Sequence, residues 1–105
     1  MIVRYATNRL QKICQDERER KKAYAKLDDK IAMRHNALEM AISMSDLIHI
    51  DPGGRWHPLH GNKAGEWAGK LSGNHRLVVI PERKGAEIVG IEEEVVTVTS
   101  IEDYH

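Results

Sequence analysis

Residues 55–82, RWHPLHGNKAGEWAGKLSGNHRLVVIPE, decide the fold, because short apolar runs alternate there with turn-forming residues. The intervening segments HGNKAG and SGN supply the Gly and Asn that tight turns require. The pattern predicts an antiparallel meander with strands at 56–59, 66–71 and 76–80. A last strand is predicted at 95–101, and the polar segment between it and the meander is predicted to be a loop with at most a brief strand at 87–91.

The first part of the chain is helical in its periodicity. An alternating stretch at 2–6 predicts the first strand, and the apolar residues within 10–14 have the spacing of one helix face. A second, long helix is predicted over 18–43, followed by a turn at the Pro-Gly-Gly of 52–54. We therefore expect residues 1–105 to form one α+β domain, with two N-terminal helices packed on a single antiparallel β-sheet.

Composition sets the class of protein. The chain is 41% hydrophobic but only 5% aromatic and has no Phe, so its core must be mainly aliphatic, with Trp67 as the expected aromatic contribution. The lone Cys14 cannot form an internal disulfide and is expected to be a buried thiol. No apolar run is long enough to span a membrane, and we expect a cytoplasmic protein with no membrane partner.

The net charge is zero, yet the charges are segregated along the chain. Residues 1–35 carry ten Lys/Arg against five Asp/Glu, and residues 55–76 carry four against one. The cations Arg18, Arg20, Lys21 and Lys22 are either a solvated helix face or a patch for a nucleic-acid backbone. Composition alone leaves both interpretations open.

Histidines near strand ends supply the candidate chemistry. His57 and His60 could join Asp103 and His105 as metal ligands, but Pro58 interrupts the first pair, which also lacks the helical setting of familiar zinc motifs. We expect neither a metal nor another cofactor.

Metal-independent cleavage of RNA needs fewer groups. The RNA 2′-hydroxyl is an internal nucleophile, so a base, a cation for the phosphate and an acid for the 5′-oxygen suffice. Histidine titrates near neutral pH, and the planar guanidinium of arginine binds phosphate oxygens in pairs. In an extended terminus Asp103 and His105 would lie on one side and Tyr104 on the other, and a terminal carboxylate would favour the charged form of His105.

The motif in 55–82 together with the closing DYH resembles the HigB-type toxins of the RelE/ParE superfamily, which belong to bacterial type II toxin–antitoxin modules. The resemblance implies a RelE-like fold and a ribosome-dependent mRNA endoribonuclease. It also implies a site whose residues are His57, Arg76, Asp103, Tyr104 and His105.

Chemistry assigns the roles within that site. Arg76 would bind the scissile phosphate, and His57 and His105 would transfer protons. Asp103 would orient an imidazole or act as the base, and Tyr104 would stack on or position the RNA.

One position departs from the family pattern. His60 stands where these toxins usually have a lysine, and Lys63 from the following turn is a candidate to replace that cation as a substrate-binding residue. The expected partners are the ribosome, mRNA and a cognate antitoxin, often of the helix-turn-helix type. The alternative is a ParE-like module that inhibits DNA gyrase without nuclease activity.

Overall fold

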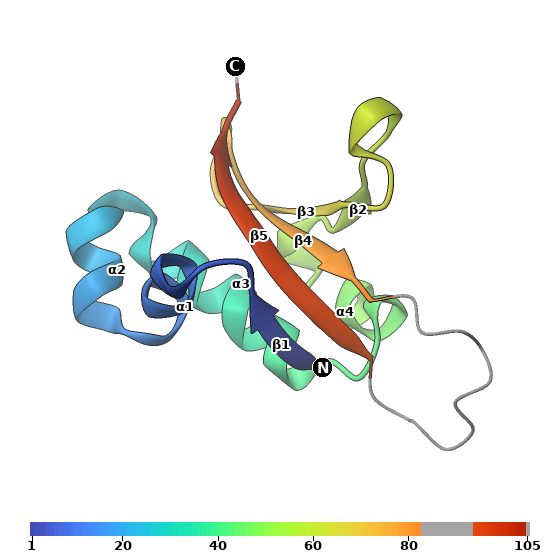
Figure 1. The fold of residues 1–105 in the computed structure, drawn as a ribbon, viewed down its shortest axis with the longest axis horizontal. Coiled ribbons are helices and arrows are strands. Elements are labelled where there is room, and N and C mark those ends of the chain that lie inside the picture. Colours follow the sequence, from blue (N-terminus) through green and yellow to red (C-terminus); the bar gives the residue numbers. More distant parts are fainter. Residues whose placement is uncertain (83–93, 105) are drawn as a thin grey trace.

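A computed structural model describes residues 1–82 and 94–104. Helices and strands follow one another as a strand, a helical segment and then a run of strands, so the predicted α+β class is confirmed (Figure 1). The predicted brief strand at 87–91 lies outside the described residues. The strands are β1 (Ile2–Tyr5), β2 (His57–Pro58), β3 (Trp67–Lys70), β4 (His75–Pro81) and β5 (Val95–Asp103); the α-helices are α1 (Asn8–Gln15), α2 (Glu17–Ala23), α3 (Asp28–Met40) and α4 (Met44–Ile50); and the 3-10 turns are η1 (Ala25–Leu27), η2 (Pro52–Gly54) and η3 (Gly61–Lys63).

Within the described residues the strands form one five-stranded sheet in the order β1-β5-β4-β3-β2. The meander β2 to β5 is antiparallel as expected, but β1 pairs with β5 in parallel, so the sheet is mixed. Parallel pairing is possible because β1 and β5 are not joined by a short turn: the helices and the rest of the meander lie between them in the chain. The pairing of β4 with β5 is interrupted by a bulge at Val78 and Val79.

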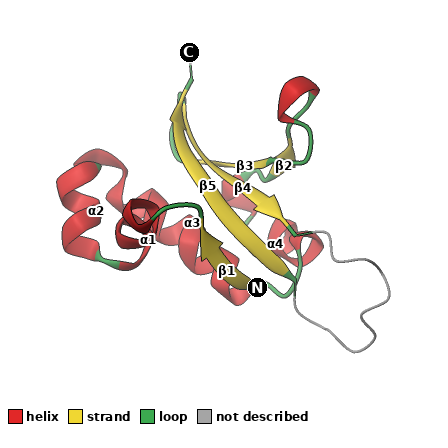
Figure 2. Cartoon of the chain, viewed as in Figure 1, coloured by secondary structure: helices red, strands yellow, loops and turns green. Residues whose placement is uncertain are grey.

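The core lies between the helices and one face of the sheet. In Figures 1 and 2, α3 and α4 lie behind β1, β5 and β4. Ile31 and Leu38 of α3 and Leu47 of α4 are fully buried in the same cluster as Leu77 and Val79 of β4. No helix in the described part of the chain is long and apolar enough to cross a bilayer.

The long helix predicted over 18–43 is wrong, because the chain breaks at Tyr24. Arg20, 8% exposed, donates through Nε to Asp28 Oδ1 at 2.7 Å and through Nη1 to the carbonyls of Ile13 and Cys14. In a continuous helix residues 20 and 28 would be separated by about 12 Å along the axis. The break brings this buried ion pair together and lets α3 turn onto the sheet.

Helix α4 is also absent from the sequence-based prediction, which had only a turn before the meander. Ser43 Oγ caps it by accepting from the backbone N–H of Asp46, while Asp46 Oδ2 accepts from the N–H of Ile42. The helix ends at Asp51, and η2 follows directly. It therefore delivers the chain into the segment that carries His57.

Candidate active site

Three predicted residues from separate parts of the chain line one pocket of about 230 Å³ on the sheet face away from the core cluster. They are His57 on β2, Arg76 on β4 and Tyr104, which follows β5. Strand pairing explains the convergence. Lys70, Arg76 and Glu102 are direct partners across β3, β4 and β5, and paired residues project to the same face.

His57 lies one row further along the same face. Its partner on β3 is Ala68, two residues before Lys70, which is a displacement of about 6.6 Å along a strand. Tyr104 is held at the other end, where its backbone N–H donates to the Asn74 carbonyl at 2.7 Å. The pocket is thus bounded by backbone pairing as well as by side chains.

Arg76 is fixed by a carboxylate that it shares with Lys63. Its Nε and Nη2 each lie 2.9 Å from Glu102 Oε1, and Lys63 Nζ lies 2.7 Å from Glu102 Oε2. The hydrogen bond from Lys63, reinforced by Arg76, lowers the pKa of Glu102, and the same bond raises the pKa of Lys63. The Tyr104 ring covers the guanidinium, with Arg76 Cζ 4.4 Å from the ring centroid.

The other edge of this guanidinium has no protein acceptor among the described residues, to none of which Arg76 Nη1 donates a hydrogen bond. A phosphate oxygen entering the pocket can therefore be bound without first breaking the ion pair with Glu102. Together, Arg76 and Lys63 offer two cations around one carboxylate.

His57 has a defined tautomer in its neutral form. Its Nδ1 lies 2.8 Å from the Arg55 carbonyl oxygen, which can only accept, so Nδ1 carries the proton. The side chain is exposed, and Nε2 is left with its lone pair as a proton acceptor. A histidine can act as a base only through an unprotonated ring nitrogen, and in His57 that nitrogen is Nε2.

The segment that carries His57 is anchored below the sheet. Trp56 is 5% exposed and packs against Gly69 of β3, where an added Cβ would meet its ring carbons at 2.6 Å. Because neighbouring residues of an extended chain point to opposite faces, burying Trp56 sends His57 to the pocket side. Trp56, rather than the half-buried Trp67, is consequently the aromatic residue of the core.

A buried hydrogen-bond network holds this anchor in place. Arg34 of α3, 3% exposed, donates to Asp51 Oδ1 at 2.8 Å, to the Gly53 carbonyl at 3.0 Å and to the Lys70 carbonyl at 2.7 Å. The Trp56 indole N–H donates to the second oxygen of Asp51 at 2.9 Å. Helix α3, turn η2 and strand β3 are thereby tied together around one guanidinium.

The remaining predicted residues lie elsewhere. Asp103 is paired with His75 on β5 and β4, with Oδ2 3.6 Å from His75 Nε2 and Oδ1 3.3 Å from Asn74 Nδ2. Its place in the strand directs it to the face opposite Arg76. His60 is exposed at the start of η3, and His105 lies outside the described residues. The described part of the chain contains no group of three or more His, Cys, Asp or Glu side chains able to hold a metal ion.

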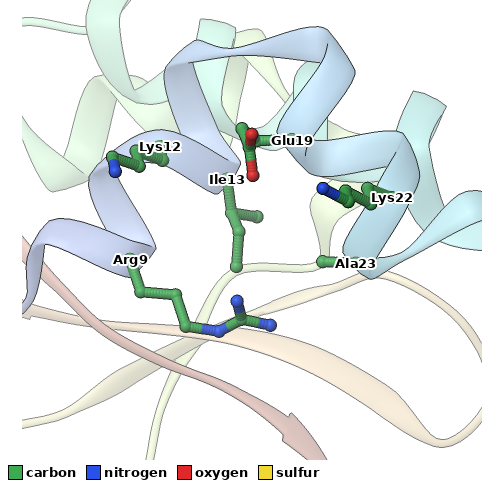
Figure 3. Close-up of a pocket in the computed structure, with 6 residues that line it drawn as sticks. All are labelled: Arg9, Lys12, Ile13, Glu19, Lys22 and Ala23. Atoms are coloured by element: carbon green, nitrogen blue, oxygen red, sulfur yellow. The ribbon is translucent and has the colours of Figure 1, made fainter.

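A larger pocket, of about 420 Å³, lies between α1 and α2 (Figure 3). Arg9, Lys12 and Lys22 surround Ile13, with Glu19 as the carboxylate of the rim. No histidine lines this pocket, so proton transfer is better placed at the pocket of His57.

Only part of the proposed patch for a nucleic-acid backbone is exposed. Its four cations are Arg18, Arg20, Lys21 and Lys22. Arg20 is buried and paired with Asp28, so its inclusion in a nucleic-acid surface is wrong. Lys21 pairs with Glu17 at 2.9 Å on the exposed helix surface, and Lys22 lines the larger pocket.

Sequence reasoning missed Arg55, Lys70 and Glu102. Glu102 precedes Tyr104 by two residues in the strand, so alternation already places both on one face. Lys70 could be found only from the register of the hairpin, and Arg55 only from its place in the lining of the pocket.

Comparison with known proteins bears on this arrangement at the level of the fold. No protein-family model matches the sequence, and no curated protein matches it. Among solved structures, a YoeB/ParE toxin from Agrobacterium tumefaciens superposes over 100% of both chains, with a TM-score of 0.58 and 18% sequence identity. The chain has the fold of this toxin. The predicted RelE-like architecture is therefore confirmed, while activity has to be argued from the residues of the site.

Proposed function

We propose that this protein is the toxin of a type II toxin–antitoxin pair and that it cuts mRNA on the ribosome by metal-independent acid–base chemistry. The observation that carries the proposal is the convergence of His57, Arg76 and Tyr104 on one pocket. These residues provide two of the groups that RNA cleavage through the 2′-hydroxyl requires, a proton acceptor and a phosphate-binding cation, together with an aromatic surface that can stack on a base.

The reaction begins with proton transfer to His57. Its Nε2 takes the proton of the 2′-hydroxyl, and the 2′-oxygen attacks the adjacent phosphorus. The bond from phosphorus to the 5′-oxygen of the next nucleotide breaks, and that oxygen receives a proton from the acid. The products are a 2′,3′-cyclic phosphate and a 5′-hydroxyl, and no water is consumed.

Charge on the phosphate is stabilised by Arg76. Its guanidinium is held in place by Glu102 and covered by Tyr104, so little reorganisation is needed when the phosphate arrives. Lys63 adds a second cation next to the same carboxylate, which supports its proposed role as the substitute for the family lysine at His60.

The acid is His105 in this proposal, a role assigned by the chemistry of its imidazole, while the resemblance implies only that it belongs to the site. Asp103 keeps the proposed role of orienting an imidazole, and the imidazole it contacts among the described residues is that of His75, at 3.6 Å on the face opposite Arg76. Tyr104 stacks on or positions a base, and His60 contacts the substrate from the exposed start of η3.

The partners follow from the proposed role. A toxin of this type acts on the ribosome and its mRNA and is neutralised by a cognate antitoxin, for which we propose a helix-turn-helix protein. The proposed location is the cytoplasm, where ribosomes and mRNA are present.

The test is cleavage of a defined mRNA on translating ribosomes, mapped by primer extension. We expect specific cuts with the wild-type protein and a loss of at least about 100-fold for His57→Ala, since a positioned acid or base contributes about 10²–10⁴ in rate. Arg76→Ala should be impaired similarly, whereas Lys26→Ala, on the exposed surface of η1, should cut normally.

A parallel supercoiling assay addresses the alternative. Inhibition of DNA gyrase with the mRNA left intact would favour the ParE-like module over the nuclease. Cleavage that is unchanged in both His57→Ala and Arg76→Ala would contradict the assignment of the site.

A further inference from the structure

Two cations of the pocket have no ion-pair partner among the described residues. Arg76 shares Glu102 with Lys63, but neither Arg55 nor Lys70 forms an ion pair with any residue that the structure describes. Both side chains are exposed, and both line the pocket beside Arg76. The pocket thus carries positive charge beyond what binding one phosphate at Arg76 would use.

Arg55 is held in an uncommon backbone conformation. Its φ of 46° and ψ of 43° lie in the left-handed region, and it is the sole non-glycine residue in the described part of the chain with a positive φ. Such conformations are strained and persist where the surroundings enforce them, often at ligand-binding sites. Here the burial of Trp56 and the bond from Arg34 to the Gly53 carbonyl enforce it.

The same guanidinium also sets the position of Lys70. Arg34 Nε donates to the Lys70 carbonyl, and Arg34 Nη2 donates to the Gly53 carbonyl, two residues before Arg55. A single buried side chain therefore fixes the backbone at both unpaired cations. Their spacing is set before any ligand arrives, which lowers the cost of binding.

We propose that Arg55 and Lys70 form a second phosphate subsite, which binds the RNA phosphodiester next to the one held by Arg76. The inference rests on the proposed function, because it takes RNA as the ligand. In this arrangement one pocket binds two consecutive phosphates, with Tyr104 and His57 placed around the scissile one. Arg34 is a positioning residue for the subsite.

The test measures binding without chemistry. A short single-stranded RNA with 2′-O-methyl groups has no nucleophile, so fluorescence anisotropy across a salt series reports contacts alone. For single strands the slope of log K against log salt changes by about 0.7 for each phosphate contact. We expect the slope to fall in Lys70→Ala and to have fallen by about 0.7, the value for one phosphate, when Arg55→Asn is added.

Control variants separate charge from folding. Asn tolerates the left-handed region, and Arg55→Lys should restore the slope lost in Arg55→Asn. Lys26→Ala removes the same charge at an exposed position away from the pocket and should leave the slope unchanged. Lys70→Ala alone still tests the subsite if Arg55→Asn fails to fold.

The outcomes also separate this inference from the proposed function. A slope equal to that of the wild type in both Lys70→Ala and Arg55→Asn, with an effect only in Arg76→Ala, would overturn the subsite and leave the nuclease proposal intact. The expected slopes in a protein that does not cut mRNA on ribosomes would support the subsite and overturn the nuclease.

Discussion

Replacing Asp51 with Asn tests the network beneath the pocket. Both carboxylate oxygens of Asp51 accept from buried donors, one from Arg34 Nη1 and the other from Trp56 Nε1. Asn has one oxygen and one NH₂ group, so the NH₂ must face one of these donors whichever way the amide is turned. The substitution also leaves the Arg34 guanidinium, 3% exposed, without a counter-charge.

The magnitude follows from the burial of the pair. Removing one partner of a buried ion pair costs about 3–5 kcal/mol. A domain of this size is expected to have a free energy of unfolding of about 5–15 kcal/mol, so the variant should remain largely folded yet measurably weakened. For a urea slope of about 1.5 kcal/mol/M, the unfolding midpoint should fall by roughly 2–3 M.

The assay is urea unfolding followed by circular dichroism, with Glu17→Gln as the matched control. Glu17 pairs with Lys21 on the exposed helix surface, where solvent screens the interaction, so the unfolding midpoint of Glu17→Gln should shift little. A fall of less than about 0.5 M for Asp51→Asn would mean a loss below about 1 kcal/mol, and the network would not be the anchor described above.

Three further outcomes follow from individual contacts. Gly69→Ala places a Cβ against the Trp56 ring and should lower the free energy of unfolding by about 1–3 kcal/mol. Gly73→Ala adds a Cβ with no atom within 4 Å and should leave the free energy of unfolding unchanged, so equal effects of the two substitutions would contradict the packing. Folding lowers the pKa of Glu102, so wild type should be more stable than Glu102→Gln near neutral pH, and this difference should vanish as pH falls through that pKa. Urea unfolding midpoints measure the difference, and a difference that grows in acid would refute the reasoning. Burial raises the pKa of Cys14 to about 11, so its thiol should react with Ellman's reagent at pH 8 only after unfolding, and fast reaction of the native protein would contradict its placement.

The local sequence pattern was sufficient to predict much of the fold. The alternation of 2–6 and the meander of 55–82 predicted strands that match β1 and β2 to β4 to within a few residues, because the side-chain period of a strand is visible in sequence. Helix α4 also had a local signal, since Ser43 and Asp46 have the spacing of a capping box. The Pro-Gly-Gly that follows led to the prediction of a turn alone.

Other features depend on contacts between distant segments. The break at Tyr24 is stabilised by the ion pair of Arg20 with Asp28, and no periodicity in one segment reveals that pairing. The parallel placement of β1 beside β5 likewise depends on how the helices cover the sheet. Which tryptophan is buried was decided by Gly69, whose missing side chain makes room for Trp56.

The site shows the same division. His57, Arg76 and Tyr104 were found from motif and chemistry, and the structure places them around one pocket. Glu102 was treated as an ordinary strand residue, although its two-residue spacing from Tyr104 placed it on the pocket face. Arg55 and Lys70 required the strand register and the buried Arg34 network, which only the folded chain reveals.

The most direct test of the central claim is the chemistry of the cut ends. An mRNA with a single 2′-deoxy nucleotide at the mapped cleavage position should resist the protein on translating ribosomes, and the unmodified mRNA should yield a 2′,3′-cyclic phosphate and a 5′-hydroxyl. Cutting of the deoxy-substituted mRNA at that position, leaving a 5′-phosphate, would contradict the account, because the nucleophile would then not be the 2′-hydroxyl that His57 is placed to deprotonate.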